Sequence, residues 1–226
     1  MTSDLRRQLI LSAAKRCFAR HGFAGTTTKS VAAAASISEG LLFKHFPTKS
    51  ALYAEILADE CEADPELHKL LDHTPSTETL VELIGSMVRH FLQVSQSPDQ
   101  EDAQRLRLAV GSHLDDGEFA RVLYEKVAGL IGPLFTASLQ QAIETGEALT
   151  SRGNPMDLFW FAHHTLLTTA LTRLPSVPCL VYGDHIERRL CEFILRGIGL
   201  NETAITYHLD RASLPNAGRP VVTERA

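Results

Sequence analysis

The side chains best arranged to act on a partner molecule stand in the segment ISEGLLFKHFPTKS, residues 37–50. On a helix, Ile37, Leu42 and Phe46 share one face and can pack on a protein core. The other faces combine an acid, an aromatic ring and two bases beside a glycine, at Glu39, Gly40, Phe43, Lys44 and His45. Because Gly40 has no side chain, a partner can approach the backbone closely there. This pattern is typical of a helix that lies in the major groove of DNA.

Other groups of reactive side chains predict little chemistry. Adjacent residues on a helix, such as His163 and His164, diverge by about 100° and seldom share one metal ion. The run Asp115-Asp116-Gly117-Glu118 lacks the later ligands of a calcium loop. Ser112 beside His113 has neither the strained turn nor the third partner of an activated nucleophile. We therefore expect no metal site, no cofactor and no enzymatic activity.

Helical patterning covers nearly the whole chain, and Gly or Pro residues fall at the joints. Thr27 or Thr28 can cap a helix before KSVAAAA, Ser38 can cap the next helix, and Pro47 ends it. We expect helices over residues 4–21, 29–35, 39–46, 49–61, 76–96, 100–114, 117–146, 155–173 and 183–199.

The first three expected helices fall within about 45 residues, and a three-residue turn joins the second to the third. This arrangement predicts a helix-turn-helix. In the first helix the predicted buried stripe includes Leu5, Leu9, Ile10, Ala14 and Phe18.

Charge is unevenly distributed along the 226 residues, whose formal net charge is −5. Residues 1–50 hold eight Lys and Arg against Asp4 and Glu39, a net charge of +6, which leaves −11 for the remainder. A basic end on an acidic body indicates that this end meets a polyanion. The four cysteines form no CxxC pair, and neither a signal peptide nor an apolar run of about 18 residues is found, so we expect a cytoplasmic protein without a membrane span.

About 50 residues resemble the DNA-binding domain of the tetracycline-repressor (TetR) family of bacterial regulators, in the segment AAKRCFARHGFAGTTTKSVAAAASISEGLLFKHFPTKSALYAEIL. The likeness lies in four short motifs. They are A-A-x-x-x-F-x-x-x-G-F at the end of the first expected helix, T-T before the second, S-x-G-x-L-[YF]-x-[HY]-F over the third, and x-x-K-x-x-L directly after it. It implies an all-α fold with a helix-turn-helix domain over residues 1–50. A fourth helix, which ends at about residue 62, would connect this domain to the remainder of the chain. A helical ligand-binding and dimerisation domain would cover residues 51–201. Residues 202–226 carry Pro215, Gly218 and Pro220 and show little pattern, so we expect a mobile tail there.

The resemblance also implies DNA-binding residues, carried over by position: Thr27, Lys29, Ser38, Glu39, Gly40, Phe43, Lys44, His45 and Lys49. Phosphate contacts would fall on Thr27, Lys29, Phe43, His45 and Lys49. Base edges would be read by Lys29, Glu39, Gly40 and Lys44, with Glu39 accepting from cytosine N4. The chain departs from the family at Phe43, where tyrosine is usual, and at Ser36, where glycine is usual. A left-handed backbone at Ser36 would cost about 1 kcal/mol.

Two segments near the C-terminus, residues 156–174 and 185–200, suit a subunit interface. The first is apolar nearly all round, which predicts burial on every side. The resemblance implies that the two helices form an intersubunit four-helix bundle, with the interface residues Leu166, Ala170, Ile186, Leu190, Ile194 and Gly197. On the second helix, Phe193 is the alternative to Ile194. The alternative is that both helices belong to an ordinary core.

An effector site would need mostly apolar groups and a few polar ones. The candidates are Met87, Phe91, Arg107, Leu108, His113, Tyr124, Phe159, Trp160, His163 and His164. They predict a lipophilic or aromatic effector with one anionic or hydrogen-bonding end. The sequence thus predicts a homodimeric repressor, released by this effector from a pseudo-palindromic operator in double-stranded DNA. The alternatives are a ligand-independent, architectural DNA-binding protein and a binding module that no longer reads DNA.

Overall fold

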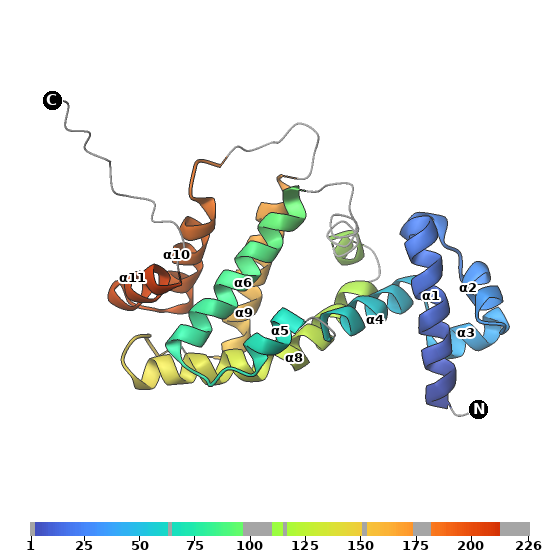
Figure 1. The fold of residues 1–226 in the computed structure, drawn as a ribbon, viewed down its shortest axis with the longest axis horizontal. Helices are drawn as coiled ribbons and strands as arrows, with labels where there is room; N and C mark the ends of the chain where they lie inside the picture. The colour runs from blue at the N-terminus through green and yellow to red at the C-terminus, as the bar shows by residue number, and fades with distance from the viewer. Residues whose placement is uncertain are drawn as a thin grey trace. The chain divides into compact units, whose positions relative to one another are not determined.

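A computed structural model of the chain describes residues 3–62, 65–96, 110–114, 117–150, 153–173 and 182–212. All regular secondary structure within these residues is helical, apart from one isolated bridge between Ala148 and Leu200 (Figure 1). The predicted all-α class is therefore confirmed. The chain forms two compact units, one of Met1–His68 with Asp99–Leu130 and one of Lys69–Pro98 with Ile131–Ala226. The functional division expected near residue 50 stays a prediction.

The first unit contains the predicted helix-turn-helix, built from α1 (Ser3–Gly25), α2 (Thr28–Ala34) and α3 (Glu39–His45), followed by α4 (Lys49–Glu62). Its apolar core takes Phe18 from α1, Val31 from α2, and Leu42 and Phe46 from α3 and its end. Ile37 packs against this core, so the inner face predicted for the third helix is confirmed.

The buried stripe of α1 differs from the predicted one. Ile10, Ala14 and Phe18 are buried, whereas the side chains of Leu5 and Leu9 are 54% and 47% exposed. A row of residues at i and i+4 drifts by about 40° at each step around a helix of 3.6 residues per turn. Leu5 and Leu9 have therefore rotated away from the face that packs against α2 and α4.

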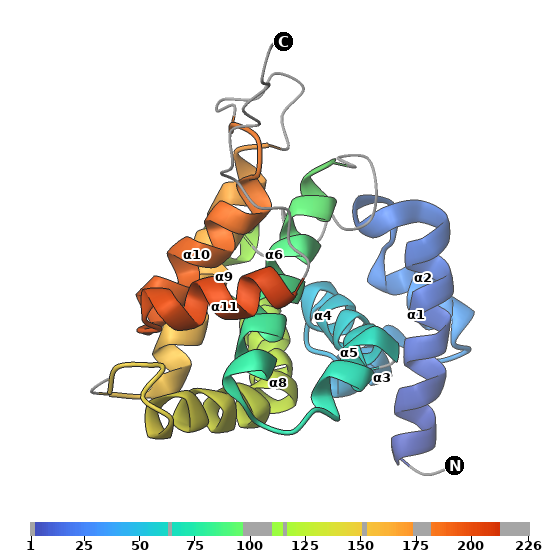
Figure 2. The same cartoon turned by 60° about the vertical axis from the view of Figure 1, so that its left-hand side comes forward.

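Helices α6 (Thr77–Gln96), α9 (Pro155–Leu171) and α10 (Ile186–Ile198) pack together in the second unit. Figure 2 shows α11 (Glu202–Arg211) crossing them, and it contacts both α6 and α10. Residues 202–211 are thus helical and do not begin the patternless tail that was expected. Asn201 caps α11 by accepting a hydrogen bond from the Ala204 N–H, and Ile205 and Leu209 are buried.

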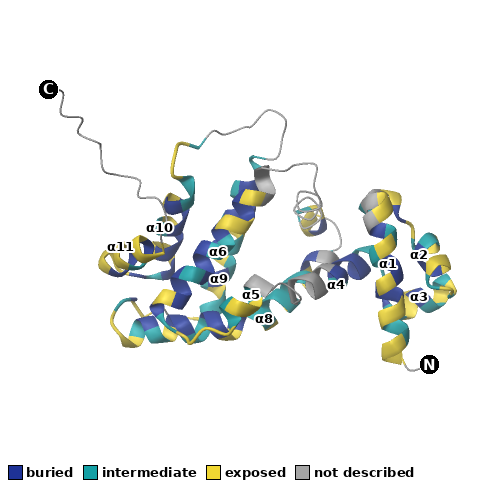
Figure 3. Ribbon diagram, viewed as in Figure 1, coloured by how far each residue is buried: buried dark blue, intermediate teal, exposed yellow. Residues whose placement is uncertain are grey.

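Two helices run across the division between the units, α5 (Pro65–Leu71) and α8 (Glu118–Glu144). Pro133 lies inside α8 and removes one backbone donor from its hydrogen-bond ladder. By length and composition alone, residues 120–144 of α8 could cross a membrane, a property that core helices of soluble proteins share. Figure 3 shows buried residues along α6 and α10, with exposed residues on their other sides, as expected of amphipathic helices.

Candidate functional site

Helix α2 begins with a reciprocal cap. The Thr27 hydroxyl accepts from the Ser30 N–H at 3.1 Å, and the Ser30 hydroxyl accepts from the Thr27 N–H at 3.1 Å. Such a capping box satisfies two backbone donors that the first helical turn leaves without intrahelical partners. Thr27 and Lys29 are both exposed beside this cap, on the surface predicted to meet DNA.

The turn between α2 and α3 contains a left-handed residue, Ser36, at φ 56°. Its N–H donates to the Ala33 carbonyl at 3.1 Å, and the Ile37 N–H donates to the Ala32 carbonyl at 3.0 Å. These bonds end α2 and turn the chain towards α3. The left-handed backbone considered for Ser36 is therefore confirmed. Ser38 then caps α3, and its hydroxyl accepts from the Leu41 N–H at 3.2 Å.

One face of α3 is open to a partner. The side chain of Phe43 is 44% exposed, and Lys44 is exposed beside it. A Cβ atom placed on Gly40 would meet no other atom within 4 Å, so the backbone there lies on an open surface. Gly40, Phe43 and Lys44 are spaced at i, i+3 and i+4 and therefore share this face. His45, at the end of α3, is half-buried.

Glu39, predicted to read a base, is tied to the preceding helix. The Thr28 hydroxyl donates to Glu39 Oε1 at 2.7 Å, and both side chains are half-buried. Thr28 and Glu39 are the first residues of α2 and α3. Sequence analysis missed this contact because the spacing of residues does not show which side chains meet across a turn.

Lys49 differs most from its predicted role as a phosphate contact. Its Nζ donates to the carbonyls of Phe23 at 2.9 Å and Thr26 at 3.1 Å, and lies 4.1 Å from the centre of the Phe23 ring. Burial lowers the pKa of Lys49. Carbonyls at a helix end lack intrahelical partners and attract cations. Lys49 therefore joins the start of α4 to the end of α1, and its contact with a phosphate stays a prediction.

A second cation, Arg7, holds the end of α3. Its guanidinium lies 4.4 Å from the centre of the Phe46 ring, 3.5 Å from the His45 carbonyl and 2.8 Å from Glu55 Oε1. Lys126 of α8 contacts the same Glu55 oxygen at 3.2 Å. Burial tends to raise the pKa of Glu55, but hydrogen bonds and charge from Arg7 and Lys126 outweigh it, and the pKa is lowered. These contacts were also missed by sequence analysis.

The predicted effector residues fall into separate groups. In the second unit Phe91 of α6 meets His163 of α9, with ring centres 5.1 Å apart. Trp160 lies 5.0 Å from Phe159 and 5.4 Å from His163, measured between ring centres. His164 adjoins this aromatic cluster, with its ring centre 5.4 Å from that of His163.

The remaining effector candidates do not belong to this group of rings. Met87 is half-buried on α6. His113 and Tyr124 belong to the first unit, where the His113 Nε2 and the Tyr124 hydroxyl lie 3.1 Å apart. Arg107 and Leu108 lie outside the described residues.

The predicted dimer residues need a correction. Leu166, Ala170, Leu190 and Ile194 are at most 9% exposed, because they pack inside the chain where α9 and α10 meet α6. Ile186 is half-buried, and only Gly197 of the predicted set is exposed. On α9 the error is one of helix phase, since the accessible apolar residue, Phe161, is 66% exposed and lies on the face opposite to Ala170. On α10 the accessible apolar residue is Phe193, 63% exposed, which lies on the same side as Gly197.

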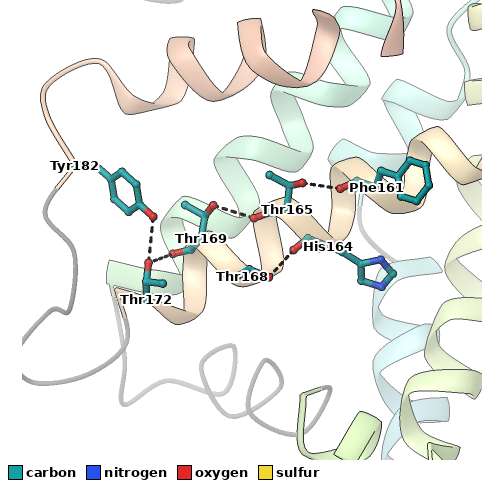
Figure 4. Close-up of a pocket in the computed structure, with 7 residues that line it drawn as sticks. All are labelled: Phe161, His164, Thr165, Thr168, Thr169, Thr172 and Tyr182. Carbon is teal, nitrogen blue, oxygen red and sulfur yellow. Dashed lines mark hydrogen bonds between the residues drawn. The ribbon is translucent and has the colours of Figure 1, made fainter. Parts of the chain in front are cut away.

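The outer face of α9 forms an open groove of about 590 Å³ (Figure 4). It is lined by Phe161, His164, Thr165, Thr168, Thr169, Thr172 and Tyr182. The hydroxyls of Thr165, Thr168 and Thr169 donate to backbone carbonyls one turn earlier, at 2.8–2.9 Å. Because these protons are used within the helix, the threonines present a surface of low polarity.

Comparison with known proteins agrees with this geometry. Residues 10–56 match the family described as "Bacterial regulatory proteins, tetR family". The HTH-type transcriptional repressor AcnR of Corynebacterium glutamicum is 26% identical over 165 residues, which are 73% of this chain and 77% of AcnR. The HTH-type transcriptional repressor Rv1474c of Mycobacterium tuberculosis is 30% identical over 126 residues, 55% of this chain and 60% of that protein.

The fold is also that of RolR. Ligand-free RolR aligns with a TM-score of 0.61 at 17% identity, over 93% of this chain and 100% of RolR. RolR in complex with resorcinol aligns with a TM-score of 0.59 at 16% identity, over 94% of this chain and 96% of RolR. These matches show that residues 10–56 form a domain described for the TetR family of bacterial regulatory proteins, and that the chain shares the fold of RolR.

Proposed function

We propose that the chain is a transcriptional repressor that binds operator DNA as a homodimer and releases it when a small aromatic or lipophilic effector binds. The observation that carries the proposal is the open face of α3, where Gly40, Phe43 and Lys44 are accessible. The relatives AcnR and Rv1474c are named as transcriptional repressors, which favours repression over an architectural role. Such a regulator acts in the cytoplasm and needs no catalytic residue.

DNA recognition would place α3 of each subunit in the major groove of one half-site. Lys44 can contact a phosphate or the O6 and N7 atoms of guanine, and Lys29 can do the same from α2. The Phe43 ring has no hydroxyl for a phosphate, so we expect it to contact sugar or a thymine methyl group. A pseudo-palindromic operator follows from the two-fold symmetry of a dimer.

Dimerisation would use the outward faces of α9 and α10. Phe161 and Phe193 are large apolar side chains exposed on these faces, and the α9 groove adds threonines of low polarity. Exposed apolar surface of this kind commonly marks an interface. A second copy of the chain would bury it and would set the distance between the two α3 helices.

The aromatic cluster of Phe91, Phe159, Trp160 and His163 is the part of the second unit best suited to an effector. Its rings favour an aromatic ligand, and the histidines can bind one hydroxyl or carboxylate group. RolR, which shares the fold, has been solved with resorcinol. Effector binding must favour the arrangement that does not bind DNA, with a coupling of about 1–3 kcal/mol.

DNA binding is tested by selecting bound sequences from random DNA and then titrating salt. Lys44→Ala should weaken binding, and should reduce the slope of log K against log salt by about 0.9 for each phosphate that is no longer neutralised. Lys69→Ala, which removes an exposed lysine outside α2 and α3, is the control and should leave the slope unchanged. Absence of DNA binding by the wild type at low salt would refute the proposal.

Effector binding can be followed directly because Trp160 is the single tryptophan of the chain. Substituted phenols and benzoates should change its fluorescence if they enter the aromatic cluster. Each ligand is then titrated with and without operator DNA. A true effector binds more weakly in the presence of operator, by the factor with which it weakens DNA binding. A ligand that binds equally well in both titrations is not the effector.

A further inference from the structure

The hydrogen bond between Thr28 and Glu39 joins the two helices that border the turn. Thr28 Oγ1 lies 2.7 Å from Glu39 Oε1, and each residue is the first of its helix. The Thr27 hydroxyl caps α2 and the Ser38 hydroxyl caps α3. The Thr28 hydroxyl is therefore not needed as a cap, and it is used to hold a neighbouring carboxylate.

This contact limits both the position and the chemistry of Glu39. A free glutamate side chain samples many rotamers, whereas a hydrogen bond to a charged acceptor is strong and fixes one of them. An ionised carboxylate can only accept, and Oε1 already accepts from Thr28. The second oxygen, Oε2, remains the natural acceptor for a donor that arrives from outside the protein.

The major groove offers few donors for such an oxygen. Cytosine presents its N4 amino group, whereas adenine places the N7 acceptor beside its N6 amino group. Guanine and thymine offer only acceptors there, apart from the thymine methyl group, and acceptors repel a carboxylate. A carboxylate held in one orientation therefore favours cytosine. A freely rotating carboxylate could also accept from adenine N6 while it stays away from the N7 acceptor, and it would discriminate less between cytosine and adenine.

We infer that Thr28 is a positioning residue for DNA sequence recognition, which holds Glu39 so that Oε2 accepts from the N4 amino group of a cytosine. The inference rests on the proposed DNA-binding function and deepens it by assigning the residue that orients Glu39 towards the base. The competing explanation is that the same hydrogen bond only fastens α2 to α3. In that case its loss would weaken binding to every sequence equally.

The variants Thr28→Val and Thr28→Ser separate these explanations. Valine keeps the shape of threonine but removes the hydroxyl, whereas serine keeps the donor. The wild-type preference is first obtained by selection from random DNA, and competition binding then compares all four bases at each position of the half-site. We expect the wild type to prefer cytosine at one position per half-site by about 5-fold to 150-fold. Thr28→Val should reduce that preference to within about threefold, and Thr28→Ser should keep it.

The remaining positions and the salt dependence should not change in Thr28→Val. Thr26→Val is the matched control, because it removes a hydroxyl that donates to the Cys17 carbonyl at 3.0 Å in the same unit. It should leave the base preferences intact. Glu39→Gln provides a second test that does not alter Thr28. Its amide oxygen can accept from Thr28 and its amide nitrogen then donates, so the preference should move from cytosine to a base that offers an acceptor.

The outcomes distinguish this inference from the proposed function. If the wild type selects no sequence, the DNA-binding function fails, and this inference fails with it. If the wild type selects an operator but Thr28→Val keeps the same base preferences, only the role of Thr28 is overturned. A uniform loss of affinity in Thr28→Val, or an unchanged preference in Glu39→Gln, would overturn it as well.

Discussion

Replacing Ser36 by glycine should stabilise the first unit although it removes a side chain. Ser36 has φ 56°, in the left-handed region where a Cβ atom crowds the backbone. The position is exposed, so the serine side chain has no place in the core. The substitution therefore relieves backbone strain in the turn between α2 and α3 and leaves the packing of both helices as it is.

The size of the effect is the difference between two opposing free energies. Relief of the left-handed conformation is worth about 1–2 kcal/mol. Glycine also gives the unfolded chain more freedom, which costs about 0.4–1 kcal/mol. These terms oppose each other, and the midpoints of the two ranges, about 1.5 and about 0.7 kcal/mol, give a net gain in the free energy of unfolding of about 0.8 kcal/mol. For a protein of this length such a gain raises the Tm by about 1–4 °C.

Native-state hydrogen exchange is the most direct assay, because two compact units need not unfold together. Protection of amides in α2 and α3, for example those of Val31 and Leu42, should increase in Ser36→Gly. The control is Ala35→Gly next to it, where φ is −85° and no strain exists to relieve. That variant should lose about 0.5–1 kcal/mol or more. If both glycine variants were destabilised by similar amounts, the reasoning from left-handed strain would be refuted.

Three further substitutions test the contacts described above. Lys49→Met should lower the free energy of unfolding by about 1–3 kcal/mol, measured in urea, because it leaves the Phe23 and Thr26 carbonyls without their charged donor. The folded-state pKa of Glu55 lies below its ordinary value of 4.5. The contribution of ionised Glu55 to the free energy of unfolding is therefore present above pH 4.5 and is lost as the pH falls through the folded-state pKa. Wild type should therefore lose more stability than Glu55→Gln between about pH 6 and pH 3 in acid titrations. Phe161→Glu should give monomers in analytical ultracentrifugation, whereas Leu149→Glu, at a site 74% exposed outside both outward faces, should remain dimeric. A dimeric Phe161→Glu would exclude the outer face of α9 as the interface.

The helix-turn-helix could be predicted because its signals are local. Thr27 and Ser38 cap successive helices, Pro47 follows the end of α3, and each signal acts within one turn of its own position. Sequence also showed which face of α3 is apolar, so the exposed positions of Phe43 and Lys44 followed. None of these inferences needed to know how distant helices pack.

The phase of α9 could not be predicted in the same way. Residues on every side of α9 are apolar, so the pattern does not say which side meets α6 and which side remains accessible. Leu166 and Phe161 are both reasonable interface residues by sequence, yet one is fully buried and the other is 66% exposed. Tertiary contacts decide between them, and those contacts come from a helix about 70 residues earlier in the chain.

The contacts of Lys49 with two carbonyls change how much of the affinity for DNA is expected to come from phosphates. Of the three lysines predicted to meet DNA, Lys29 and Lys44 are exposed, and Lys49 is held by carbonyls inside the first unit. Each neutralised phosphate contributes about 0.9 to the salt slope, so a dimer in which Lys49 keeps its carbonyl contacts should have a slope lower by about 1.8 than one in which Lys49 binds a phosphate. Non-specific attraction to the phosphates is then weaker. A larger share of the affinity for the operator then comes from hydrogen bonds to base edges, and so depends on how firmly Thr28 holds Glu39.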